Sequence, residues 1–283
     1  MRKTLIFILY ALCIHFAYTD TPEKIKVSVS IMPQKFFVEQ IGGSRVDVTV
    51  LVPPGTSPEN FDPSPRQIVQ LGNSDIYFPI GIPFENIFLD KLKNGRKKVT
   101  IADCGRDVPR LRNPEDEHEH GETDPHIWTD PLRVKIIARN MADALIEKDS
   151  ANAAVYTENL RIFSDELDRL EREIRQELAP YKGRIFYVYH SAYTYFAERF
   201  SLVQKSIETG EKEPAPAQLR NLVNQAREDR VKTIFIQPEF PASGARRVAE
   251  AIGGRTADLS VLEYSWADSM RNTARLLVES FEE

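Results

Sequence analysis

The sequence predicts an α/β protein of two halves, each with a small, mostly parallel sheet flanked by helices, and one long helix between them. Three observations support this fold class. Short apolar runs alternate with amphipathic stretches up to residue 103, one helical pattern spans 149–183, and the alternation then resumes to the end of the 283-residue chain. Strands that alternate with helices are typical of βαβ units, whose strands form parallel sheets.

The first half, residues 24–148, contains four predicted strands. The run IKVSVSI opens it, and PQKFFVEQIGG follows with helical spacing that ends at a glycine pair. Predicted strands cover 25–31, 46–54, 75–81 and 99–103, with predicted helices over 33–43 and 64–74. From Leu132 onward the helical period dominates.

A single long helix is predicted over residues 149–182. Its apolar residues recur at helical spacing, and Pro180 and Gly183 end the pattern. The predicted stripe comprises Val155, Leu160, Phe163, Leu167, Leu170, Ile174 and Leu178. At about 1.5 Å per residue, such a helix is roughly 40 Å long, enough to run along both halves. Its glutamates and arginines predict a solvated opposite face.

The second half, residues 183–283, repeats the alternation of strands and helices. Predicted strands cover 184–190, 202–207, 232–240 and 256–262, and predicted helices cover 191–200, 215–229, 243–254 and a last segment from Trp266. In such α/β architectures ligands bind in the cleft lined by loops at the carboxyl ends of the strands.

The composition and the first residues indicate an exported, folded protein. A net charge of −5 gives no basic surface for nucleic acid. Residues 1–20 read as a leader, with Arg2 and Lys3 before an apolar run that is too short to span a bilayer. Cleavage after Ala17 and a lipid anchor on Cys13 are both considered, and an apolar strand is the structural alternative. Cys104 is then the one cysteine left, so no internal disulfide is expected.

Side chains that bind metals stand at the predicted strand ends. His190 closes one strand, Glu239 follows another, and Glu59 and Asp62 lie in the proline-rich loop after the second strand. His126 precedes a helix in DPHIWTDP. Each of these is a ligand type for a divalent ion, placed where α/β clefts bind ligands.

Five stretches in order give the chain a family resemblance. They are LVPPGTSPENFDPSP, DPHIWTDP, YHSAYTYFAERFSL, EKEPAPAQL and IFIQPEF. With these the chain resembles the metal-binding solute receptors of ABC importers, the zinc and manganese proteins of the ZnuA/TroA type. The resemblance implies two α/β lobes joined by one long, rigid backbone helix, with the metal between the lobes.

The resemblance implies two metal ligands, and two further ligand positions of the family carry other residues in this chain. His126 and His190 fall on histidines that bind the metal in this family. Glu59 stands where a histidine is usual, and Ser260 stands where a carboxylate is usual. Zinc prefers four ligands and serine is a poor one, so a further group is needed. We predict Glu239 as that group, with Asp258 and Glu208 as weaker alternatives.

Zinc is the expected ion. A carboxylate in place of an imidazole makes Mn2+ or Fe2+ more plausible, but His190 is retained where manganese-type relatives tend to carry glutamate. His118 and His120, in EDEHEHGE, resemble a short form of the acidic, histidine-rich loop of zinc receptors. They are predicted to capture zinc weakly, and a solvated insertion without a role is the alternative.

The expected function is therefore non-enzymatic. The protein would bind a divalent cation in the periplasm or at the cell surface and deliver it as a monomer to a membrane permease. Protonation of the two histidines near pH 5–6 should weaken binding. Three alternatives remain: a receptor-like protein with weakened metal binding, a metal-dependent hydrolase, and a cell-adhesion protein on the same scaffold. No HExxH helix, nucleophile elbow or glycine-rich phosphate loop supports the hydrolase.

Overall fold

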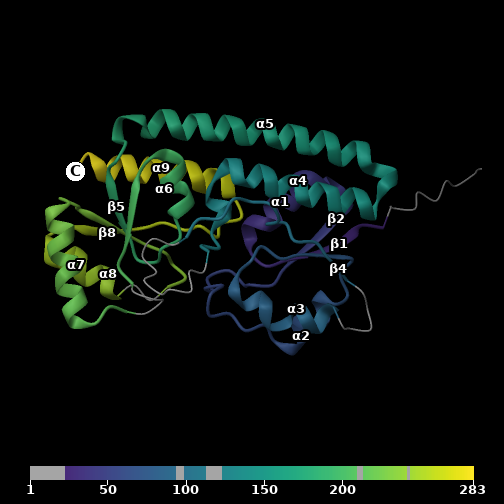
Figure 1. Cartoon of the computed structure of the whole chain (residues 1–283), viewed down its shortest axis with the longest axis horizontal. Coiled ribbons are helices and arrows are strands. Elements are labelled where there is room, and N and C mark those ends of the chain that lie inside the picture. Colours follow the sequence, from purple (N-terminus) through teal and green to yellow (C-terminus); the bar gives the residue numbers. More distant parts are fainter. Residues whose placement is uncertain (1–22, 94–98, 113–122, 209–212, 241–242) are drawn as a thin grey trace, which may run out of the picture.

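Two α/β lobes lie side by side in the computed structural model, and one long helix runs along the top of both (Figure 1). The structure describes residues 23–93, 99–112, 123–208, 213–240 and 243–283. The leader with Cys13 and the pair His118 and His120 lie outside these residues. No helix in the described part of the chain is both long and apolar enough to cross a membrane.

The N-terminal lobe contains a four-stranded parallel sheet in the order β2-β1-β3-β4. Its strands are β1 (Ile25–Val29), β2 (Val46–Val50), β3 (Ile76–Phe78) and β4 (Thr100–Ile101). Its helices are α1 (Met32–Gly42), α2 (Pro65–Leu71), α3 (Asn86–Lys93) and α4 (Pro131–Lys148). Helix α3 was not predicted, because it has only eight residues and directly follows a proline-initiated turn.

The C-terminal lobe repeats this topology with the order β6-β5-β7-β8, again all parallel. Its strands are β5 (Ile185–Val188), β6 (Val203–Ser206), β7 (Thr233–Ile236) and β8 (Arg255–Asp258). Its helices are α6 (Thr194–Phe200), α7 (Pro216–Glu228), α8 (Ser243–Ile252) and α9 (Trp266–Phe281). Strand β7 ends before Pro238, earlier than predicted, since proline cannot donate to a sheet.

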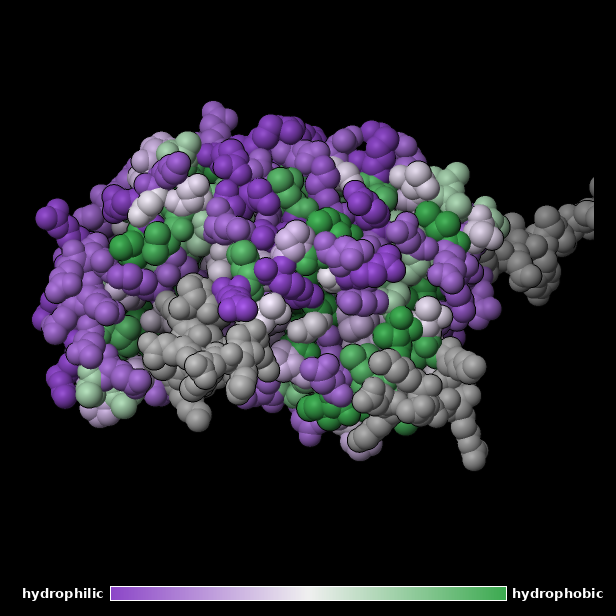
Figure 2. Space-filling view, viewed as in Figure 1, coloured by the Kyte–Doolittle hydropathy of each residue, from purple (hydrophilic) through white to green (hydrophobic). Residues whose placement is uncertain are grey.

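The long helix is α5 (Ala153–Leu178), and it packs on α1 and α4 of one lobe and α9 of the other. Six of the seven predicted stripe residues are buried or half-buried, but Val155 is exposed and its neighbour Tyr156 is buried instead. Tyr156 is held there by a 2.7 Å hydrogen bond from its hydroxyl to Asp149 Oδ2. The outer face of α5 is mostly hydrophilic, as the sequence predicted (Figure 2).

The two lobes are also in direct contact beneath α5. One apolar cluster runs from β1 to α9 through both lobes, and a smaller one fills the C-terminal sheet. The indole of Trp128 donates to Val261 O at 2.9 Å, and the indole of Trp266 donates to Trp128 O at 2.9 Å. These contacts, together with the rigid helix α5, oppose wide hinge motion between the lobes. The exact domain boundaries stay predictions.

The fold places the carboxyl ends of both sheets at the junction between the lobes. Buried groups fix these ends in the N-terminal lobe. Glu85 accepts hydrogen bonds from the backbone N–H groups of Ile80, Gly81 and Ile82, which follow β3. Cys104 is buried beside them, and burial raises the pKa of its thiol far above the usual range. A buried, protonated thiol is unreactive, which is typical of a structural cysteine.

Candidate metal centre

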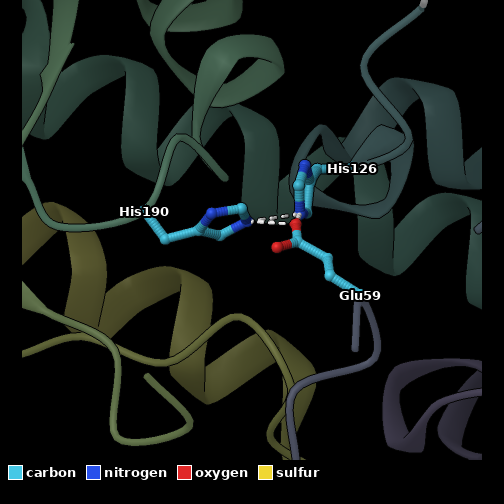
Figure 3. Close-up of side chains that lie close together, drawn as sticks. All are labelled: Glu59, His126 and His190. Carbon is cyan, nitrogen blue, oxygen red and sulfur yellow. Dashed lines mark hydrogen bonds and ion pairs between the residues drawn. The ribbon is translucent and has the colours of Figure 1, made fainter. Parts of the chain in front are cut away.

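Three side chains from separate parts of the sequence meet at the lobe junction: Glu59, His126 and His190 (Figure 3). One donor atom from each lies within 4.8 Å of the others. The Nε2 atoms of the two histidines are 3.2 Å apart. Glu59 Oε1 lies 2.5 Å from His190 Nε2 and 3.7 Å from His126 Nε2. All three side chains are about 6% exposed.

Each donor is carried by a loop at the end of a regular element. Glu59 lies on the loop between β2 and α2, where its backbone N–H donates to Ser57 Oγ at 3.3 Å. His126 precedes a short 3₁₀ turn that leads into α4, and His190 lies two residues after β5. The first two come from the N-terminal lobe and the third from the C-terminal lobe, so the centre bridges the lobes.

A buried carboxylate orients His126. Asp124 Oδ1 accepts from the ring Nδ1 and from the backbone N–H of His126, both at 2.8 Å. Burial alone would raise the pKa of Asp124, but the charge and hydrogen bonds of His126 lower it, so the carboxylate stays ionised. With Nδ1 occupied as a donor, Nε2 is the nitrogen that faces the other two side chains.

A second carboxylate orients His190 in the same way. Glu208 accepts from Nδ1 of His190. The backbone of His190 is fixed by Gln237, whose Oε1 accepts from its N–H at 3.0 Å and whose Nε2 donates to its carbonyl at 2.7 Å. The ring stacks on Phe240 with a centroid distance of 4.3 Å and an angle of 18°. The position of Nε2 is therefore fixed from three sides.

The electrostatics of the centre favour a cation. Burial lowers the pKa of His190, but the hydrogen bonds and charges of Glu208 and Glu59 raise it to about 10. Burial would raise the pKa of Glu59, but His190 and His126 lower it, so Glu59 is ionised. Its Oε2 is buried without a hydrogen-bond partner. An ionised, partly unpaired carboxylate in a buried site is costly unless a positive charge balances it. The protonated ring of His190 supplies that charge, and a divalent cation bound in place of the proton would supply it as well.

The structure leaves Glu239, the predicted further ligand, just outside the three-residue cluster. Its Oε1 accepts a 3.1 Å hydrogen bond from Ser260 Oγ, and its Oε2 is buried without a partner. Burial raises the pKa of Glu239, and the charge of His190 acts against that shift. Asp62 and Asp258 are exposed. The role of Glu239 as a ligand stays a prediction.

Sequence reasoning missed how Asp124 and Glu208 act. Asp124 was not singled out, although it stands two residues before His126 in DPH. Glu208 was considered a weak candidate for direct binding, whereas its carboxylate contacts the far side of the His190 ring. The strand register shows why Glu208 reaches the ring. Val188 of β5 pairs with Ser206 of β6, and His190 and Glu208 each lie two residues beyond that pair.

Known proteins share both the sequence pattern and the fold. The family model "zinc-uptake complex component A periplasmic" matches residues 27–280. The manganese ABC transporter substrate-binding lipoprotein PsaA of Streptococcus anginosus is 28% identical over 76% of this chain and 72% of its own length. The high-affinity zinc uptake system protein ZnuA of Bacillus subtilis is 25% identical, over 85% and 79% respectively.

A solved structure agrees over nearly the whole described fold. A crystal structure of ZnuA superimposes with a TM-score of 0.87 at 32% identity, covering 91% of this chain and 99% of that one. The resemblance inferred from the five motifs is thus confirmed. The chain belongs to the ZnuA family and is an extracytoplasmic solute-binding protein of the metal ABC importers.

Proposed function

We propose that this protein carries zinc, with Glu59, His126 and His190 as direct ligands. The convergence of the two Nε2 atoms carries the proposal. Two imidazoles bound to one tetrahedral zinc at about 2.0–2.1 Å place their nitrogens roughly 3.3 Å apart. Here the separation is 3.2 Å, so the two nitrogens already have the spacing that a shared zinc ion requires.

Glu239 is proposed to complete the shell. It is held by a hydrogen bond from Ser260, which it can exchange for a metal–oxygen bond. Alternatively, a metal–oxygen bond to Oε2 would give the unpaired buried oxygen of Glu239 a partner while Oε1 keeps its hydrogen bond from Ser260. A shell of two imidazoles and two carboxylates is neutral with a divalent ion, and its imidazoles suit zinc better than Mn2+.

A carrier role, without catalysis, fits the surroundings of the site. Glu239 lines a cavity of about 140 Å³ between the lobes, together with Ile31, Val52 and Glu263. Small-molecule sites usually have about 300 Å³ or more. A closed shell also leaves no open coordination position for a reacting water. The proposed partner is the membrane permease of the importer, approached by a monomer.

Two matched variants in one loop test the ligand assignment. Zinc binding is measured by isothermal titration, beside metal analysis of protein purified without chelator. Glu59→Gln removes the proposed oxygen ligand, and Asp62→Asn removes the same charge from the exposed neighbour. We expect about one zinc per chain, a clear loss for Glu59→Gln and parental affinity for Asp62→Asn. Equal losses of zinc affinity in both variants would indicate that Glu59 acts only through its negative charge and is not a ligand.

A second pair tests Glu239. Glu239→Ala should weaken zinc binding, because it removes the fourth ligand. Ser260→Ala should leave the affinity unchanged or increase it, because it frees Glu239 from its hydrogen bond. If both variants bind like the parent, Glu239 is not a ligand.

The weak capture site proposed at His118 and His120 is tested separately by stoichiometry. Replacement of both by alanine should remove any weak second zinc equivalent in the titration and leave the tight one. An unchanged titration would favour the solvated insertion.

A further inference from the structure

We propose that Asp124 and Glu208 are positioning residues that fix the tautomer and direction of the two histidines, and so set the strength of metal binding without touching the ion. The proposal rests on the proposed function of the centre. It adds two residues, one per lobe, that act through the ligands.

The geometry around His126 supports this role. Both the ring Nδ1 and the backbone N–H of His126 donate to the same oxygen of Asp124 at 2.8 Å. One carboxylate atom therefore fixes the ring relative to its own backbone. The loop itself is held to the C-terminal lobe, since Tyr195 donates from its hydroxyl to Asp124 O at 2.6 Å. Rotation of the ring would break its Nδ1 contact with this anchored carboxylate.

His190 is held by groups that are distant in sequence. Glu208 follows β6, Gln237 follows β7, and Phe240 lies beyond it on the same loop. Glu208 is the group among these that contacts the ring nitrogen, so it selects the tautomer. The stacked Phe240 and the backbone contacts of Gln237 restrict the plane and position of the ring without favouring either nitrogen.

Charge gives the two carboxylates a second effect through the same contacts. A carboxylate that accepts from Nδ1–H makes the opposite nitrogen a stronger donor to a metal. Loss of such an outer contact typically weakens metal affinity by about 10–100-fold. Glu208 contacts one atom of His190, whereas Asp124 also holds the backbone. The alanine variant at 208 should thus change binding with little effect on folding.

The test compares alanine with amide variants in the full protein. Zinc affinity is measured by titration for Asp124→Ala, Asp124→Asn, Glu208→Ala and Glu208→Gln. Asp149→Asn is the control, since Asp149 accepts hydrogen bonds from Tyr156 and Asn152 and contacts no residue of the centre. In ¹⁵N spectra of the zinc-loaded protein, each histidine is expected to show a protected Nδ1–H and a metal-bound Nε2.

We expect both alanine variants to bind zinc about 10–100-fold more weakly, with loss of the protected Nδ1–H signal of the affected histidine. The amide variants keep an acceptor oxygen and should recover part of the affinity, and the control should match the parent. Alanine variants within twofold of the parent overturn the proposal. So do equal losses for alanine and amide with an unchanged Nδ1–H signal. If the parent itself binds no zinc, the proposed function fails instead.

Discussion

The two lobes have the same sheet topology but bring their histidines to the centre by different routes. Each sheet is a parallel four-stranded sheet in which the second strand lies outside the first. In the C-terminal lobe, His190 and its carboxylate partner follow adjacent paired strands. In the N-terminal lobe, His126 has its carboxylate two residues away in the same loop, and Glu59 comes from another loop.

This difference shows that one local geometry can be built from two kinds of sequence. Sheet register makes the contact between His190 and Glu208, whereas loop conformation makes the contact between Asp124 and His126. Both produce an imidazole whose Nε2 points at the lobe junction. Each lobe therefore presents an equivalent imidazole nitrogen to the centre, and the following predictions challenge the proposal that both nitrogens bind the metal.

The largest effect is expected from removal of either imidazole. His126→Ala and His190→Ala each delete one proposed ligand, so each should weaken zinc binding by more than the roughly 100-fold upper end of an outer-contact loss. Titration of both variants under identical conditions checks this. A near-parental affinity in one of them would show that its lobe does not supply a ligand.

Zinc affinity should fall steadily as the pH is lowered, because His190 must lose a proton before it can bind the metal. Its pKa is raised to about 10 by Glu208 and Glu59 against the effect of burial, so the metal-free ring is protonated at neutral pH. Below that pKa, each pH unit should cost about tenfold in affinity, or roughly 100-fold between pH 7.5 and 5.5. The loss of zinc binding that the sequence predicts near pH 5–6 is thus expected to begin at a higher pH. Equal affinities at both values would contradict it.

A smaller effect is expected where a charged contact links the lobes. Arg199 of α6 donates to buried Asp130, the residue that caps α4, at 2.9 and 2.8 Å. Asp130 keeps Arg133 as a second partner at 2.6 Å. Arg199→Ala should therefore lower the free energy of unfolding by only about 2 kcal/mol. Thermal unfolding measures this loss, with Arg247→Ala as the control, since Arg247 is an exposed residue of α8. An unchanged Tm would indicate that apolar packing and α5 hold the lobes together without a contribution from Arg199.

The smallest effect is expected on the outer face of α5. Arg161 pairs with Glu158 at 2.7 Å and with Asp165 at 2.8 Å, all three exposed. Water screens such pairs, so Arg161→Ala should change neither the Tm nor the zinc affinity measurably. A change in affinity would indicate that this face takes part in coupling the lobes.

Much of the fold could be predicted because its signals are local. The alternation of strand and helix patterns placed the eight strands found among the described residues, and the apolar period placed α5 with its buried face. Helix α3 and the inward turn of Tyr156 in place of Val155 were missed. Both depend on packing at short or terminal segments, where the apolar period spans too few turns to define a face.

The sequence by itself determined the fold class, the family and the residue types of the centre, because periodicity and motif spacing are properties of the chain. Only the tertiary structure decided which donors meet. It brought Glu59, His126 and His190 together. It also placed Glu239 in a hydrogen bond with Ser260, and it placed the carboxylates of Asp124 and Glu208 at the Nδ1 atoms of the two histidine rings. Distances between loops of different lobes depend on strand register and lobe packing, which no linear spacing encodes.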